Sequence, residues 1–200
     1  MSMMFARTMP LLLLTVMLSA CASGFTPTGD ATFKGKTLAV IAGLDNEPNL
    51  AVAQAMSESL RKNTHFQVMP YKQAAQAVTG YPGKIQGPYK TSYFELQVDY
   101  TRTDLKRIKA IQQQLGVDYL YVLWSPTETV YNDKIHSLNI VSQMFSAGKE
   151  VGSGRFNAVA GRSDCCLVPA PDTKDKADAI RDATDYVAKE IGEKTGMAKH

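Results

Sequence analysis

Two adjacent cysteines, Cys165 and Cys166, are the most unusual chemical element of the sequence. Neighbouring Cα atoms lie about 3.8 Å apart across a trans peptide bond, less than the usual disulfide span of about 4.4–6.8 Å. A disulfide between these two residues is therefore strained and easily reduced. Three states remain open: such a disulfide in the turn before Pro169, two buried thiols, or a thiol that reacts with a substrate or with another chain.

The three histidines, His65, His136 and His200, lack the spacing that metal sites need. The sequence has no His-Glu-x-x-His motif, and no histidine lies at a zinc-ligand interval from a cysteine. The run Gly152-Ser153-Gly154 does not complete a phosphate-binding Gly-x-Gly-x-x-Gly motif, because Asn157 stands at its last position. We therefore expect no metal, no cofactor and no enzymatic activity.

The first twenty residues are typical of an export signal. Arg7 precedes an apolar run over residues 11–18, which is much shorter than the roughly 20 residues of a membrane-spanning helix. The run ends in Leu18-Ser19-Ala20-Cys21, which resembles the lipobox of bacterial lipoproteins. This resemblance implies cleavage before Cys21 and a covalent lipid on its thiol. Because Ala22 rather than Asp follows, it also implies an anchor in the outer membrane, with the domain facing the periplasm.

Residues 21–36 are rich in Gly, Thr and Pro and predict a flexible tether behind the lipid. The folded domain is then expected over residues 37–196, with a short tail over 197–200. The whole sequence carries a formal net charge of +3, and the leader contributes only Arg7 to it. Such a balance gives no basis for a nucleic-acid partner, which needs a clustered basic surface.

Hydrophobic patterns predict strands alternating with helices. The nearly continuous apolar run 37–42 predicts a strand covered on both faces, and apolar residues at helical spacing over 50–60 predict a helix that Asn46 or Asn49 caps. The other expected elements are a strand at 66–71, a helix at 104–115, strands at 117–124, 135–144 and 150–159, and a helix at 175–194. This order predicts an α/β (α+β) fold, a single domain with a mixed sheet of about five strands and helices packed on it.

An irregular region rich in Gly and Pro begins at residue 80, and aromatic residues gather in it. Long loops of this kind are more often functional than neutral, and aromatic side chains contribute most at the centres of interfaces. One interpretation is an interaction surface formed by Tyr81, Tyr89, Tyr93 and Phe94. The other is that these aromatics cover the edge of the core. The loop over residues 162–171 is a second candidate contact.

Three segments resemble the small α/β domain of TolB-type periplasmic proteins, of the curli-secretion lipoprotein and of the lipoprotein activators of peptidoglycan synthases. They are the opening Gly35-Lys36-Thr37-Leu38-Ala39-Val40-Ile41, the strand Phe66-Gln67-Val68 and the junction Leu115-Gly116-Val117-Asp118-Tyr119-Leu120-Tyr121-Val122. In that family the domain is a protein-interaction module or an assembly subunit without catalytic residues. The resemblance implies an envelope protein as partner and leaves a homo-oligomer open.

Three functions follow from these observations. The leading hypothesis is a membrane-anchored, non-catalytic protein-interaction or assembly module of the cell envelope. The second is a lipoprotein that binds a glycan or a lipid at the aromatic surface. The third is an enzyme in which Cys165 or Cys166 reacts.

Overall fold

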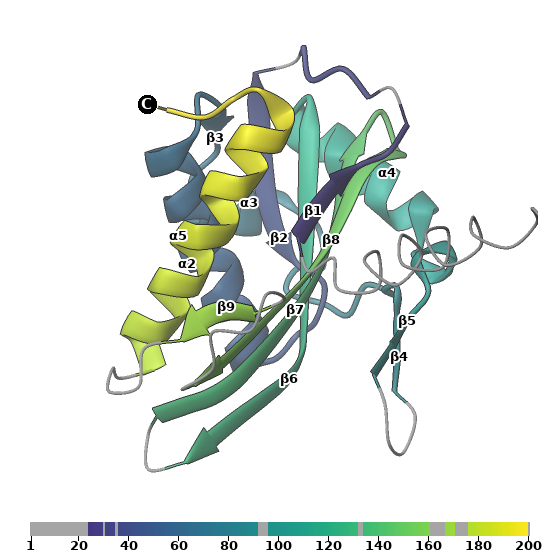
Figure 1. Ribbon diagram of the computed structural model, residues 1–200. Coiled ribbons are helices and arrows are strands. Elements are labelled where there is room, and N and C mark those ends of the chain that lie inside the picture. Colours follow the sequence, from purple (N-terminus) through teal and green to yellow (C-terminus); the bar gives the residue numbers. More distant parts are fainter. Residues whose placement is uncertain are drawn as a thin grey trace, which may run out of the picture.

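A mixed sheet runs through the molecule, with helices packed on both of its faces (Figure 1). The computed structural model describes residues 24–29, 31–34, 36–91, 96–131, 134–160, 167–170 and 176–199. Predictions made for Cys21, Tyr93, Phe94, Cys165 and Cys166 therefore lie outside the described residues. The predicted α/β (α+β) fold, one domain with a mixed sheet and packed helices, is confirmed.

The main sheet has the strand order β1-β8-β7-β6-β2-β3, and β9 also pairs with β8. Strand β2 is parallel to both β3 and β6, whereas β7 is antiparallel to both β6 and β8. The bounds of these strands are β1 Gly24–Pro27, β2 Thr37–Ala42, β3 Gln67–Val68, β6 Tyr119–Tyr131, β7 Lys134–Ser146, β8 Lys149–Ala160 and β9 Leu167–Ala170. The expected antiparallel pairing of β6 with β7 is confirmed.

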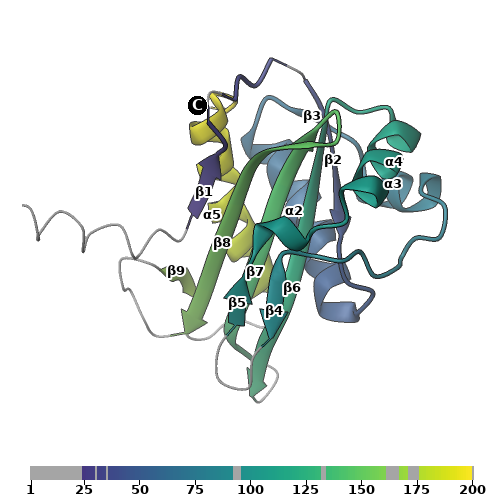
Figure 2. The same cartoon turned by 90° about the vertical axis from the view of Figure 1, so that its right-hand side faces the viewer.

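Strand β2 is buried on both faces because it lies between two apolar clusters. Leu38, Val40 and Ala42 belong to the cluster that α2 (Glu47–Asn63) and α5 (Lys176–Thr195) cover. Ala39 and Ile41 belong to the other, which α3 (Tyr71–Ala77) and α4 (Leu105–Leu115) cover. Figure 2 shows the sheet between these two layers of helices. The continuous apolar run therefore predicted the position of β2 correctly.

The helix ends follow local capping rules. Asn46 caps α2 and accepts a hydrogen bond from the Asn49 backbone N–H at 3.0 Å. Helix α4 begins after Asp104 and ends at Gly116, whose φ of 62° is the left-handed conformation that favours glycine. Leu105, which the sequence pattern places inward, is 50% exposed. It lies in the first turn of α4, before the stretch that contacts the core.

The expected irregular region contains a second, small sheet. Residues 78–88 form a loop, which β4 (Tyr89–Thr91) and β5 (Leu96–Val98) follow as an antiparallel pair. Figure 1 shows this pair standing away from the main sheet. A 3₁₀-helix, η2 (Tyr100–Arg102), then leads the chain back to α4. No helix of the described part is long and apolar enough to cross a bilayer.

The prediction that the folded part begins near Thr37 is wrong. Strand β1 lies inside the expected tether and pairs with β8, and its Phe25 is only 1% exposed. A Cβ on Gly152 would overlap the Phe25 ring, so β8 makes room for this side chain by using glycine. The Phe25 backbone N–H also donates to Glu190 of α5 at 2.9 Å. Phe25 therefore docks β1, and Phe33, which also lies in the expected tether, packs against the same core cluster.

The expected tail is also part of the fold. Residue Ala198 forms an isolated antiparallel bridge with Thr64, and Met197 packs against the core cluster under α2 and α5. The Met197 carbonyl accepts from the His65 backbone N–H at 2.7 Å. The chain end is thus tied to the end of α2.

Replacing Phe25 by Ala should lower the free energy of unfolding by about 3–5 kcal/mol, the usual cost of deleting a buried aromatic side chain. Thr26, which is exposed in the same strand, provides the matched control. Thr26→Ala should change stability by no more than about 0.5 kcal/mol. Urea unfolding of both variants measures the difference, and equal effects would show that β1 does not contribute to the fold in solution.

Candidate interaction site

The loop over residues 78–88 is held against the end of β2 by Trp124. The indole Nε1 donates to the Ile85 carbonyl at 3.2 Å, and the Ile85 backbone N–H donates to the Gly43 carbonyl at 2.8 Å. The indole ring lies against both Gly43 and Gly87, and a Cβ on either glycine would overlap it. Two of the glycines in this region are therefore required by the close approach of one aromatic ring.

Asn49 joins α2 to the turn that follows β2 and to the first half of β6. Its side chain is fully buried, and its Nδ2 donates to the carbonyls of Leu44 at 3.2 Å and Leu123 at 3.1 Å. Its Oδ1 accepts from the Ser125 backbone N–H at 2.6 Å. Sequence reasoning considered Asn49 only as an alternative cap. The missed signal is a polar residue at an inward position of an amphipathic helix.

Tyr81 provides a second side-chain contact near the carboxyl end of β2, in addition to Asn49. Its hydroxyl accepts from the Ala42 backbone N–H at 2.9 Å and forms a hydrogen bond of 2.7 Å with the Tyr71 hydroxyl. Burial raises the pKa of both phenols above the usual value, so both stay protonated at neutral pH. The two rings meet edge to face, with centroids 6.4 Å apart.

Of the four predicted surface aromatics, the structure describes two, and both are partly buried. Tyr81 packs against both apolar clusters, and Tyr89 packs against the cluster under α3 and α4. These contacts match the interpretation in which aromatics cover the core. An interaction role for Tyr81, Tyr89, Tyr93 and Phe94 stays a prediction. In the second candidate loop, β9 pairs with β8, and the rest of it lies outside the described residues.

A hollow of about 520 Å³ opens beside Tyr81, and we call it the Tyr81 hollow. It lies between the loop that follows β2, the first turns of α2, and α3. Its residues are mostly apolar or aromatic, with two carboxylates and no lysine or arginine among them: Asp45, Asn46, Glu47, Leu50, Ala51, Gln54, Tyr71, Ala75, Tyr81 and Pro82. Open α/β sheets commonly bind ligands beyond the carboxyl ends of their strands, which is where this hollow lies.

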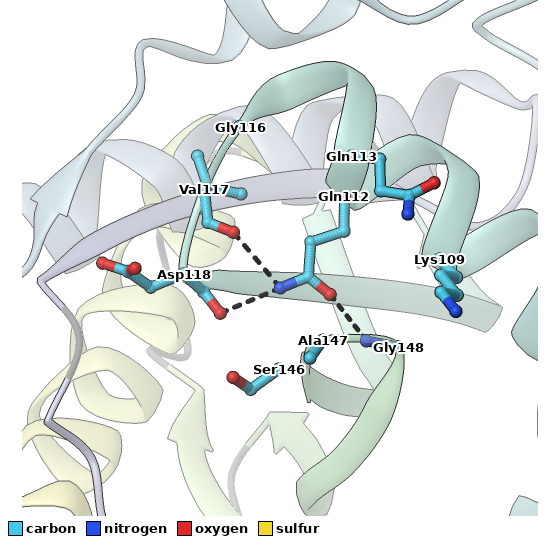
Figure 3. Close-up of a pocket in the computed structure, with 9 residues that line it drawn as sticks. All are labelled: Lys109, Gln112, Gln113, Gly116, Val117, Asp118, Ser146, Ala147 and Gly148. Atoms are coloured by element: carbon cyan, nitrogen blue, oxygen red, sulfur yellow. Dashed lines mark hydrogen bonds between the residues drawn. The ribbon is translucent and has the colours of Figure 1, made fainter.

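A second hollow, of about 530 Å³, lies near the opposite end of β2 (Figure 3). Gln112 of α4 points into it, and its Nε2 donates to the carbonyls of Val117 at 3.2 Å and Asp118 at 2.8 Å. Its Oε1 accepts from the Gly148 backbone N–H at 3.0 Å. Gln112 thus joins α4, the start of β6 and the turn between β7 and β8, which is a structural use of its amide.

Asp118 at the same hollow uses its carboxylate to hold the start of β2. Its Oδ2 accepts from the backbone N–H groups of Lys36 at 2.8 Å and Thr37 at 2.9 Å, and from the Thr37 hydroxyl at 2.8 Å. The hydrogen bonds from Thr37, followed by the one from Lys36, hold the pKa of the Asp118 carboxyl below its usual range. The polar groups around this hollow therefore fix strand ends.

Within the described residues, no group of three or more His, Cys, Asp or Glu side chains is placed to hold a metal ion. His65 is exposed between α2 and β3. The Tyr81 hollow offers apolar and aromatic contact with a negative rim, which suits binding. Its two phenols are engaged with each other and with the backbone, so they serve as a wall of the hollow.

No protein-family model matches the chain, and no curated protein matches it. Among solved structures, the PelC dodecamer from Paraburkholderia phytofirmans is similar at 7% identity and a TM-score of 0.47, with 90% of this chain and 99% of that chain covered. A single-substitution variant of that dodecamer is similar at 8% identity and 0.47, with 84% and 96% covered. A likeness of this size says nothing about what the present chain binds or how it assembles.

Replacing Asn49 by Ala removes the side-chain partner of the Leu44 carbonyl and of the Ser125 N–H group, whereas the Leu123 carbonyl keeps its bond from the Gly43 N–H. Each group left without a partner costs about 1–3 kcal/mol, so we expect the free energy of unfolding to fall by at least about 2 kcal/mol. Gln54→Ala on the exposed side of the same helix should have almost no effect. Chemical unfolding compares the two variants. A small effect of Asn49→Ala would contradict the conclusion that its hydrogen bonds stabilise the contact of α2 with the sheet.

Asp118→Asn tests the hydrogen bonds at the start of β2 through pH. Because the pKa of Asp118 is lower in the folded protein, its stabilising contribution is complete above the unfolded pKa of about 3.9. This contribution is lost as the pH falls through the folded pKa. The unfolding midpoint of the wild type should therefore fall more steeply below about pH 4 than that of Asp118→Asn. Parallel curves for the two proteins would count against this assignment.

Proposed function

We propose that this chain is a non-catalytic interaction module of the bacterial envelope, anchored in the outer membrane by a lipid on Cys21. In this proposal the partner is an envelope protein, and it binds at the Tyr81 hollow. The observation that supports it most is an apolar hollow with an acidic rim beyond the carboxyl end of a central strand. The export signal and the lipobox-like Leu18-Ser19-Ala20-Cys21 support the location.

The walls of the hollow are fixed before any partner arrives. Asn49 holds the start of α2, and the Tyr71–Tyr81 pair holds α3 against the end of β2. A partner that binds such a surface orders few side chains of this protein. Pre-organisation of this kind reduces the entropic cost of association.

The chemistry of the hollow favours a lysine or arginine side chain of the partner. Asp45 and Glu47 carry negative charge at its rim, and neither lysine nor arginine lines it, although Glu47 also pairs with Lys176 of α5 at 3.9 Å. The aliphatic stem of a long basic side chain can lie along Leu50 and Ala75, while its charged end meets the carboxylates and the Tyr71 ring. The partner is therefore an envelope protein that presents a basic residue in an exposed segment.

A photocrosslinking amino acid in place of Ala75 tests this proposal in cells that make the natively lipidated protein. We expect one crosslinked envelope protein, with a lysine or arginine beside the crosslinked position when the peptide is mapped by mass spectrometry. Asp45→Lys should reduce its yield at least about tenfold, because like charges that face each other across an interface cost several kcal/mol. The same amino acid placed at Glu58, which lies on α2 outside the hollow, is the positional control.

The charge control is Glu58→Lys, which makes the same change of charge away from the hollow and should leave the yield unchanged. Cys21→Ala should abolish the crosslink because the protein no longer reaches the membrane. Equal crosslinking from positions 75 and 58, or a yield that Asp45→Lys does not alter, would refute binding at the Tyr81 hollow.

A further inference from the structure

The outer part of the main sheet carries polar side chains on the face where Trp124 lies. The register pairs Trp124 with Val141, and Val141 with Arg155. Because side chains alternate along a strand, every second residue of β7 and β8 shares this face with Val141. We call the following residues the polar strand face: Asn139, Gln143, Ser153, Arg155 and Asn157.

One end of the polar strand face is closed by internal hydrogen bonds. Gln143 is fully buried, and its Oε1 accepts from the Thr103 hydroxyl. Its Nε2 donates to Glu150 at 2.5 Å and to the Tyr100 carbonyl at 3.4 Å. These contacts hold η2, and with it Tyr100, close to β8. Burial, with the nearby Glu150 charge, raises the pKa of Tyr100 to about 12, so its hydroxyl stays protonated.

Arg155 lies in the middle of this face. It is partly buried, and no carboxylate among the described residues forms an ion pair with it. Its Nε is enclosed and has no hydrogen-bond partner in the described part, and the same holds for Oδ1 of Asn139. Each such enclosed atom costs about 1–3 kcal/mol, but no ligand from solution reaches it. The accessible part of Arg155 is the feature that a ligand can meet, because its charge is partly buried without an ion-pair partner among the described residues.

The residues around Arg155 indicate which chemical groups a ligand would need in order to bind it. A guanidinium matches the two oxygens of a carboxylate, whereas the Glu150 carboxylate close to Tyr100 disfavours a dianion such as phosphate. Asn139 and Asn157 add amide groups, which donate to and accept from hydroxyls, while the Ser153 hydroxyl is already hydrogen-bonded to Tyr100. A ligand with one carboxylate beside several hydroxyls fits this set better than an acidic peptide, which offers few hydroxyls.

We propose that the polar strand face binds an acidic saccharide, with a sugar carboxylate on Arg155, ring hydroxyls on Asn139 and Asn157, and the sugar ring against Tyr100. This binding is independent of the partner at the Tyr81 hollow. The two surfaces use different residues, so either proposal can fail while the other stands.

Isothermal titration calorimetry of the full-length lipidated protein in detergent tests this proposal with defined tetramers. We expect saturable binding of tetragalacturonate or tetramannuronate and none of maltotetraose, which lacks the carboxylates, or of tetraglutamate, which lacks the hydroxyls. Arg155→Gln should weaken binding at least about tenfold, because a hydrogen-bonded charge contributes about 1.5–3 kcal/mol. Arg181→Gln removes the same charge from an exposed site on α5 and should not change the affinity.

Circular dichroism and the thermal midpoint establish that each variant is folded. If Arg155→Gln does not fold, Arg155→Lys keeps the charge without the planar fork and should still weaken binding at least about fivefold. The proposal is overturned if neither uronate tetramer binds, if tetraglutamate binds as tightly, or if the folded Arg155 variant keeps the wild-type affinity.

Discussion

The burial of β2 on both faces is the constraint from which the rest of this structure follows. The backbone groups at the two ends of such a strand need hydrogen-bond partners outside the strand ladder. At the amino end, Asp118 accepts from the backbone of Lys36 and Thr37. At the carboxyl end, Tyr81 accepts from Ala42, while Asn49 donates to the Leu44 carbonyl just beyond the strand and to the Leu123 carbonyl of β6. Both hollows lie where these side chains gather, because closing a strand end brings loops and helix ends together.

Local patterns in the sequence predicted the elements whose signals are local. The apolar run of β2, the Asn46 cap and the alternation that pairs β6 with β7 each depend on neighbouring residues. Strand β1 was missed because its docking depends on space that Gly152 provides in a distant strand. No window of sequence around Phe25 contains that information.

The residues of the candidate site also differ in how far the sequence could predict their roles. Aromatic content pointed to Tyr81 but not to its bond with the backbone of Ala42, a residue 39 positions away in the chain. The joints made by Asn49 and Trp124 likewise depend on residues brought together by the fold. Arg155 was not noticed, because only the folded structure shows that no carboxylate of the described part forms an ion pair with it. Composition indicates which side chains are available, and the topology decides what they contact.

The early position of β1 bears on the proposed lipid anchor, because it would set how close the domain lies to a membrane. With a lipid on Cys21, only two residues separate the anchor from Gly24, where pairing with β8 begins. Three residue steps span at most about 11 Å, roughly the thickness of one helix with its side chains. The domain would then be held close to the membrane through its edge strand β1, instead of being joined to the anchor by a flexible linker of sixteen residues. The fold would then limit the orientation of the domain relative to the bilayer. A partner would have to bind at a face of the domain that does not lie against the membrane.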